Sequence, residues 1–131
     1  MTVLVYSDDV DTREQVKRAI GRRPAADVPR VDWLECATGP AVIAALDSGD
    51  VDVAILDGEA TPFGGMGIAR QAKDEIFRCP PIVLLTGRVT DGWLANWSRA
   101  EAAVPHPLDP IELARAVAEQ MRRRRSELTT S

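Results

Sequence analysis

The feature that most constrains this chain is a largely apolar run at residues 51–56 that ends in a carboxylate, Asp57. Such a run is typical of a central parallel strand, because helices cover both faces of that strand. The chain then turns at once through a loop rich in glycine and proline, residues 58–65. A carboxylate at the end of such a strand lies at the carboxyl edge of the sheet, where open α/β folds bind their ligands.

Two further predicted strands also end in polar residues. Residues 2–6 run into Ser7 and Asp8, and residues 82–85 run into Thr86. Because the carboxyl ends of parallel strands share one edge, three such ends predict a common site. The simpler alternative is that the acid after residue 56 only caps the loop that follows its strand.

Strand and helix patterns alternate five times, which predicts a parallel sheet with helices on both faces. The expected strands are 2–6, 31–36, 51–57, 82–85 and 102–104, and the expected helices are 11–20, 39–48, 66–77, 90–97 and 110–125. Right-handed crossovers leave few arrangements of five such units. We therefore expect an α/β fold, a flavodoxin-like (βα)5 doubly wound sheet of five parallel strands in the order 2-1-3-4-5. That order places the first strand beside the third, so Asp8 and Asp57 would meet.

Length and composition fit one globular domain. The chain has 131 residues and a net charge of −4, which argues against a dedicated nucleic-acid binder. We expect one domain over 1–125 and a polar, frayed tail over 126–131. No stretch nears the roughly 20 apolar residues of a membrane span, and no signal-peptide pattern opens the chain, so a cytoplasmic protein is expected. Cys36 and Cys79 have no CxxC spacing and are expected to be free thiols.

Five segments resemble the receiver domain of bacterial two-component response regulators, and the resemblance covers nearly the whole chain. These segments are 4–13, 56–57, Gly65, 85–87 and 106–110. The first resembles the family's acid pocket, the second its phosphoacceptor position and the last its Lys-Pro-Phe segment.

The resemblance implies a role for each residue of a phosphorylation site. Asp57 would accept a phosphoryl group from a histidine kinase, and Asp8, Asp57 and the backbone carbonyl of Glu59 would hold Mg²⁺. The Thr86 hydroxyl would sense the phosphoryl group. His106 takes the place of the lysine that pairs with the acceptor. We expect a signalling module and not an enzyme, with no catalytic residue of its own.

The sequence departs from the family pattern at several positions, and the loop proline, Pro62, lies one residue late. Ser7 replaces the first acid of the pair, His106 replaces the lysine, and Ala103 replaces the aromatic residue that reports activation. A histidine is shorter than a lysine and mostly neutral at pH 7, so a fixed positive charge beside Asp57 is lost. A stable aspartyl-phosphate is then disfavoured. Asp9 is either a compensating acid or an acid at the start of a helix.

Three other features each allow more than one interpretation. Trp93 and Trp97 are four residues apart and share one helix face, which serves either core packing or a partner interface. Residues 122–125 are four arginines, which form either a phosphate or lipid patch or a solvated helix end that complements the helix dipole. His106 between two prolines is a metal ligand, a pH sensor or a hydrogen-bonded turn residue.

Two functions follow, and we favour the first. The first is an atypical stand-alone receiver that binds another protein or assembly with little or no dependence on phosphorylation. The second is a working phosphoacceptor at Asp57. A weaker third is a small anion held by the loop 58–67. Neither nucleic acid nor integration in a membrane is expected, and the sequence indicates no particular partner, pathway or oligomeric state.

Overall fold

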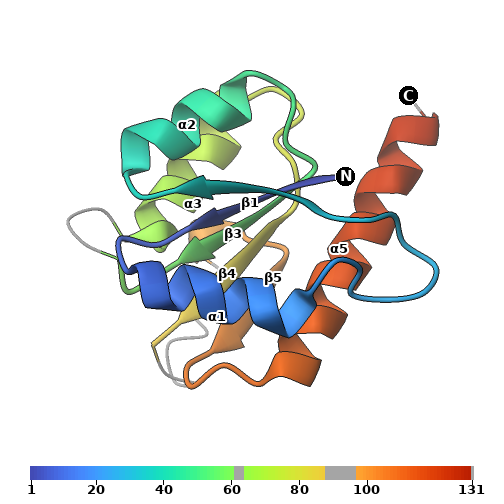
Figure 1. Cartoon of the computed structure of the whole chain (residues 1–131). Helices are drawn as coiled ribbons and strands as arrows, with labels where there is room; N and C mark the ends of the chain where they lie inside the picture. The colour runs from blue at the N-terminus through green and yellow to red at the C-terminus, as the bar shows by residue number, and fades with distance from the viewer. Residues whose placement is uncertain (61–63, 88–96, 131) are drawn as a thin grey trace.

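The computed structural model describes residues 1–60, 64–87 and 97–130, and its elements alternate between strands and helices along the chain (Figure 1). The strands are β1 (Thr2–Tyr6), β2 (Asp32–Cys36), β3 (Val53–Asp57), β4 (Ile82–Thr86) and β5 (Ala102–Pro105). The helices are α1 (Val10–Ile20), α2 (Gly39–Asp47), α3 (Gly65–Glu75) and α5 (Pro110–Thr130). The helix expected at 90–97 falls almost entirely outside the described residues.

The five strands form one sheet in the order β2-β1-β3-β4-β5, and every pairing is parallel. The predicted fold class and strand order are therefore confirmed. Figure 1 shows the sheet in the middle, with α2 and α3 over one face and α1 and α5 over the other. This is the doubly wound arrangement that alternating strands and helices predict.

The two faces of the sheet support separate cores. Successive residues of a strand point to opposite faces, so Val3 and Val5 pack toward α1 and α5 while Leu4 and Tyr6 pack toward α2 and α3. β3 and β4 are buried at every position. The edge strand β2 is largely exposed, as its alternating pattern predicts.

Local signals fix where the helices begin and end. The Asp9 side chain caps α1 by accepting a hydrogen bond from the Asp11 backbone N–H at 2.9 Å. Thr38 caps α2, and Pro40 lies in the first turn of that helix. Gly21 ends α1 with φ of 67°, a conformation that favours glycine.

The C-terminal helix is longer than the sequence suggested. We expected it to end near residue 125 and to be followed by a frayed polar segment, but α5 continues to Thr130. Serine, glutamate, leucine and threonine are all compatible with a helix, so polarity alone misplaced its end. No helix in the described part of the chain is both long enough and apolar enough to cross a membrane.

Candidate functional site

The polar strand ends converge on one edge of the sheet, as the strand order predicts. β1 and β3 are neighbours, with Tyr6 paired to Leu56, and β3 and β4 are neighbours, with Asp57 paired to Leu85. Asp57 and Thr86 therefore end adjacent strands, and Ser7 follows the end of β1. In Figure 1 this edge lies at the left, where the arrowheads of the central strands point.

Asp57 is held by hydrogen bonds to both oxygens of its carboxylate. Its side chain is only 6% exposed. The Ser7 hydroxyl donates to Oδ2 at 2.8 Å, and the Glu59 backbone N–H donates to Oδ1 at 2.9 Å. The protein itself thus satisfies a buried charge that would otherwise be costly.

Ser7 is itself fixed in place. It is fully buried, and its hydroxyl oxygen accepts a hydrogen bond from the Asp9 backbone N–H at 3.1 Å. Its carbonyl accepts one from Arg13 Nη1 at 2.6 Å, while Arg13 Nε pairs with Glu35 at 3.2 Å. The sequence reasoning identified Ser7 only as a lost acid. Ser7 follows the end of a strand next to the one that ends in Asp57, and this position could have indicated that its hydroxyl donates to the Asp57 carboxylate.

His106 faces the same carboxylate. Its Nε2 lies 3.6 Å from Asp57 Oδ1, which is beyond hydrogen-bonding distance, and this buried nitrogen has no hydrogen-bond partner in the described residues. The His106 backbone N–H donates to the Thr86 carbonyl at 2.8 Å, and the bond to Pro107 is cis. A neutral or protonated imidazole thus occupies the position beside Asp57 that the resemblance gives to lysine.

Asp8 and Asp57 both act electrostatically on Tyr6. The Tyr6 side chain is buried, and burial is the main cause that raises the pKa of its hydroxyl. The negative charges of Asp8 and then of Asp57 raise the pKa further. The Asp8 and Asp57 carboxylates therefore both lie near the Tyr6 hydroxyl. Asp8 is exposed, and Asp57 is buried. Asp9 caps α1, which matches its interpretation as an acid at the start of a helix.

The backbone around Asp57 leaves no room for a side chain at Gly65. A Cβ there would lie 2.7 Å from the Asp57 carbonyl oxygen. The start of α3 is thereby packed directly against the end of β3. The glycine that the resemblance noted eight residues after Asp57 has a steric reason.

Metal ligands are sparse at this edge. Within residues 1–60, 64–87 and 97–130, no three side chains of His, Cys, Asp or Glu group closely enough to hold a metal ion. The predicted ligand set uses only two such side chains, Asp8 and Asp57, with the Glu59 carbonyl as the third oxygen. The metal assignment and the sensing role of Thr86, which is buried, stay predictions.

Of the two tryptophans, Trp93 lies outside the described residues. Trp97 is 50% exposed, so it does not serve core packing. The Arg70 guanidinium lies 5.6 Å from the centre of its ring, and Arg70 Nη1 donates to the Trp97 carbonyl at 2.9 Å. An exposed aromatic residue stacked by an arginine is typical of an interface, and the interface role stays a prediction.

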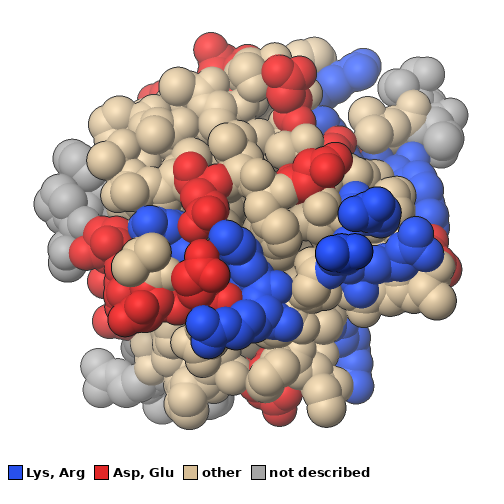
Figure 2. All heavy atoms as spheres, viewed as in Figure 1, with Lys and Arg blue, Asp and Glu red and all other residues tan. Residues whose placement is uncertain are grey.

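The arginines at 122–125 do not form a simple solvated end. Arg122 forms a two-pronged pair with Asp27, at 2.7 and 2.8 Å, and Arg125 donates to the Asp27 carbonyl at 2.7 Å. Arg124 is buried. Figure 2 shows basic side chains along α5 and over α1, while acidic side chains gather near the start of α1.

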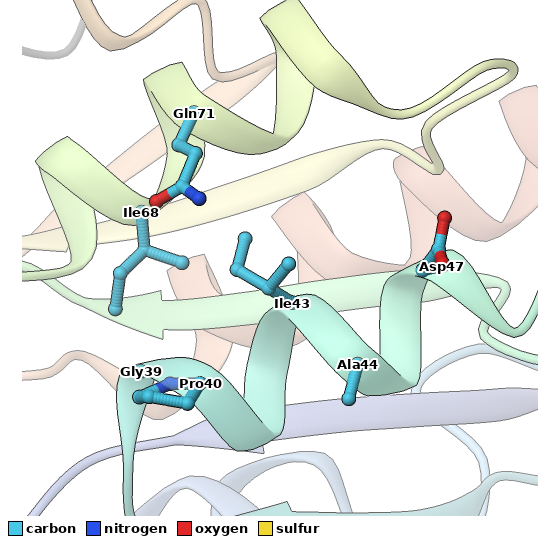
Figure 3. Close-up of a pocket in the computed structure, with 7 residues that line it drawn as sticks. All are labelled: Gly39, Pro40, Ile43, Ala44, Asp47, Ile68 and Gln71. Atoms are coloured by element: carbon cyan, nitrogen blue, oxygen red, sulfur yellow. The ribbon is translucent and has the colours of Figure 1, made fainter.

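The described residues also line a groove of about 450 Å³ between α2 and α3 (Figure 3). Ile43 and Ile68 face one another across it, with Gln71 above and Asp47 at one end. None of the predicted site residues lines this groove. It is therefore separate from the edge that carries Asp57.

Comparison with known proteins places the chain in a class. No family model matches it. It is 62% identical over 122 residues to an uncharacterized response regulatory protein of Mycobacterium tuberculosis strain CDC 1551 / Oshkosh, and the match covers 93% of this chain and 92% of that protein. The same figures hold for the protein of that name in strain ATCC 25618 / H37Rv. The chain belongs to the response regulators.

Solved structures support the same fold. The signal receiver domain of a putative Luxo repressor protein from Vibrio parahaemolyticus has a TM-score of 0.79 at 18% identity, and the match covers 99% of this chain and 96% of that domain. A Francisella response regulator 1452 receiver domain has a TM-score of 0.78 at 16% identity, with 93% and 97% covered. Within the response regulators, the chain therefore has the fold of the receiver domain.

Proposed function

We propose that this response regulator is an atypical stand-alone receiver that signals by binding another protein, with little or no dependence on phosphorylation at Asp57. The observation that carries the proposal is the set of contacts around Asp57. Ser7 and the Glu59 backbone already donate to its two oxygens, and a histidine replaces the lysine beside it. A buried carboxylate whose two oxygens both accept hydrogen bonds from the protein can have a structural role without being phosphorylated.

The chemistry of phosphorylation explains why these contacts matter. An aspartate that takes a phosphoryl group needs cations nearby to balance the charge that builds up on the transferred oxygens. A lysine supplies a permanent charge, whereas an imidazole supplies one only when protonated. The Ser7 hydroxyl donates a hydrogen bond but carries no charge, so it attracts a cation less strongly than a carboxylate would. The proposal follows from the shortage of fixed positive charge and of metal-binding charge around Asp57 among the described residues.

The residues present nevertheless suit a weakly held Mg²⁺. Asp8, Asp57 and the Glu59 carbonyl are hard oxygen donors, and proteins hold Mg²⁺ through one or two carboxylates. The raised pKa of Tyr6 is consistent with negative potential from both acids. When bound, Mg²⁺ neutralises phosphoryl oxygens. Ser7 contributes no second carboxylate from β1, so affinity would be low.

The partner is expected to be a protein, and Trp97 marks the surface where it would bind. Tryptophan and arginine are the residues that most often dominate binding energy at protein interfaces. Trp97 presents half of its surface to solvent and is oriented by Arg70 on α3. This surface lies on the segment before β5. The net charge of −4 favours a protein over a nucleic acid.

A pull-down that compares the wild type with Asp57→Asn tests the proposal. The variant keeps the size of the side chain but cannot accept a phosphoryl group. We expect equal recovery of the same partner by both proteins. Loss of recovery with Asp57→Asn, while an exposed control such as Asp32→Asn keeps it, would contradict the proposal.

The alternative is a working phosphoacceptor, and the retained Asp8, Asp57 and Thr86 favour it. Under this alternative a histidine kinase or a small phosphodonor would modify Asp57. Attack by Oδ2 would then weaken the hydrogen bond that this oxygen accepts from Ser7. Covalent modification is therefore the property that separates the two functions.

A further inference from the structure

The edge of the sheet opposite Asp57 carries a second cavity. It has a volume of about 380 Å³ and lies where the C-terminal ends of α2, α3 and α5 meet. Its apolar wall consists of Leu46, Val51, Ile76, Phe77, Pro80 and Leu128. Gly49, one acid, Asp47, and two arginines, Arg78 and Arg124, complete the lining. The volume lies within the roughly 300–1,000 Å³ of small-molecule sites.

One buried arginine lines this cavity. The Arg124 side chain is only 10% exposed, and its Nε has no hydrogen-bond partner among the described residues. Its two ion pairs are long: Asp52 Oδ1 lies 3.8 Å from Nε, and Glu127 Oε2 lies 4.0 Å from Nη1. Asp52 is also engaged elsewhere, because its Oδ2 accepts a hydrogen bond from the Thr2 backbone N–H at 2.8 Å.

An arginine in this state is costly for the fold. Arginine stays charged at any physiological pH, and a buried charge is tolerated only when it is well paired. Arg122 and Arg125 on the same helix have close partners at 2.7 Å, so the loose pairing of Arg124 is not typical of this cluster. A bound anion would satisfy the guanidinium.

We infer that this cavity binds a small apolar carboxylic acid, with its carboxylate paired to Arg124 and its chain along the apolar wall. The guanidinium fork matches a carboxylate in shape and charge. Val51 and Ile76 would contact the chain, and Phe77, which is 87% exposed, would cover its outer end. This site lies apart from Asp57 and does not depend on the function proposed for it.

Decanoate is the probe for this site, and 1-decanol is its uncharged match. We expect the wild type to bind decanoate more tightly than 1-decanol in a calorimetric titration. In ¹⁵N NMR spectra, decanoate should shift the backbone amides of Gly49, Val51 and Ile76 and leave those of Asp57 and Thr86 unchanged. No binding of decanoate, or shifts centred on Asp57, would overturn the inference without touching the proposed function.

Arg124→Met keeps the aliphatic stem and removes the charge. We expect decanoate binding to weaken by roughly tenfold or more, the scale of one charge-assisted hydrogen bond, while 1-decanol binding is unchanged. Arg123→Met is the control, because Arg123 is an exposed neighbour on the same helix. Equal loss in both variants would contradict the site. The NMR map on the wild type decides the question if Arg124→Met does not fold.

Discussion

At the scale of single residues, the contact between Ser7 and Asp57 distinguishes this receiver from the pattern it resembles. A serine at the end of β1 donates to Asp57 Oδ2 at 2.8 Å, where a second acid would repel it. The protein itself thus supplies a hydrogen-bond donor to this oxygen. His106 adds an imidazole at 3.6 Å from Oδ1. Both replacements support the proposal that the site depends little on phosphorylation.

Ser7→Asp should strengthen Mg²⁺ binding. The new carboxylate would stand beside Asp57, and the charge available to a cation would rise by one. We expect the dissociation constant for Mg²⁺ to fall by roughly tenfold in a calorimetric titration, because affinity for hard cations follows the number of charged ligands. Ala26→Asp adds the same charge on an exposed loop and should change nothing. Equal affinity in Ser7→Asp and wild type would contradict the role given to Ser7.

The sequence predicted more of the site's positions than of its contacts. Strand order alone brings Asp57, Thr86 and the end of β1 to one edge, because parallel strands share their carboxyl ends. The sequence pattern identifies Ser7 only as the replacement of an acid, and it does not predict that the serine hydroxyl donates to Asp57. The pairing of Arg122 with Asp27 spans 95 residues, and no local pattern reports such a contact.

At the scale of elements, the start of α3 depends on glycine at one position and not at its neighbour. A Cβ at Gly65 would lie 2.7 Å from the Asp57 carbonyl oxygen, whereas a Cβ at Gly67 would meet nothing within 4 Å. The two glycines lie in the same turn of one helix. They form a natural pair for separating steric need from helix propensity.

Gly65→Ala should lower the free energy of unfolding by about 1–3 kcal/mol, because the backbone of β3 and α3 must move apart. Gly67→Ala should raise it by about 0.5–1 kcal/mol, since alanine favours a helix where there is room. Urea denaturation of the two variants measures both values. A stabilised Gly65→Ala would show that α3 does not press on Asp57.

The ion pair between α5 and the loop before β2 should make stability depend on pH. The hydrogen bond from Arg122 is the main cause that lowers the pKa of Asp27, from 3.8 to about 2. A lowered pKa means that the contribution is complete above the unfolded value and is lost as pH falls through the folded one. The difference in urea midpoint between wild type and Asp27→Asn should be constant above about pH 5 and shrink toward pH 3.

The control for this pH series is Asp32→Asn, which removes an exposed carboxylate at the start of β2. It should leave the urea midpoint nearly unchanged at every pH. A difference between wild type and Asp27→Asn that grows as the pH falls would contradict the ion pair.

Element boundaries were predictable where a local signal marks them. Thr38 and Pro40 set the start of α2, and the glycine at 21 ends α1. The end of α5 was wrong because a polar composition suggested a frayed tail, while five more residues continue the helix. Arg122 and Arg125 hold the preceding turns against Asp27, and this support lies outside any sequence window.

At the scale of the whole molecule, the two ends of the parallel strands carry different kinds of site. The carboxyl edge carries Asp57 and its hydrogen bonds, and the opposite edge carries the cavity with Arg124. Trp97 lies on a third surface, bound by Arg70 of α3. A receiver that signals through contact needs such a surface whether or not its acid pocket works.

Trp97→Ser should therefore reduce partner recovery in a pull-down by roughly tenfold or more, the scale of an interface hot spot. Its effect on the urea midpoint should be small, because half of the side chain is already exposed. Phe77→Ser is the matched control, an exposed aromatic residue at the opposite edge. Equal recovery by Trp97→Ser and wild type would place the interface elsewhere.

Intact mass after incubation with acetyl phosphate and Mg²⁺ tests the central claim most directly. An ordinary receiver should be run beside the wild type to show that the conditions allow phosphorylation, and Asp57→Asn should be run as the blank. We predict that the mass of the wild type stays the same, because His106 stands where a lysine would supply a fixed positive charge and Ser7 replaces an acid that would help to hold Mg²⁺. A gain of one phosphoryl group that is absent from Asp57→Asn would contradict this account.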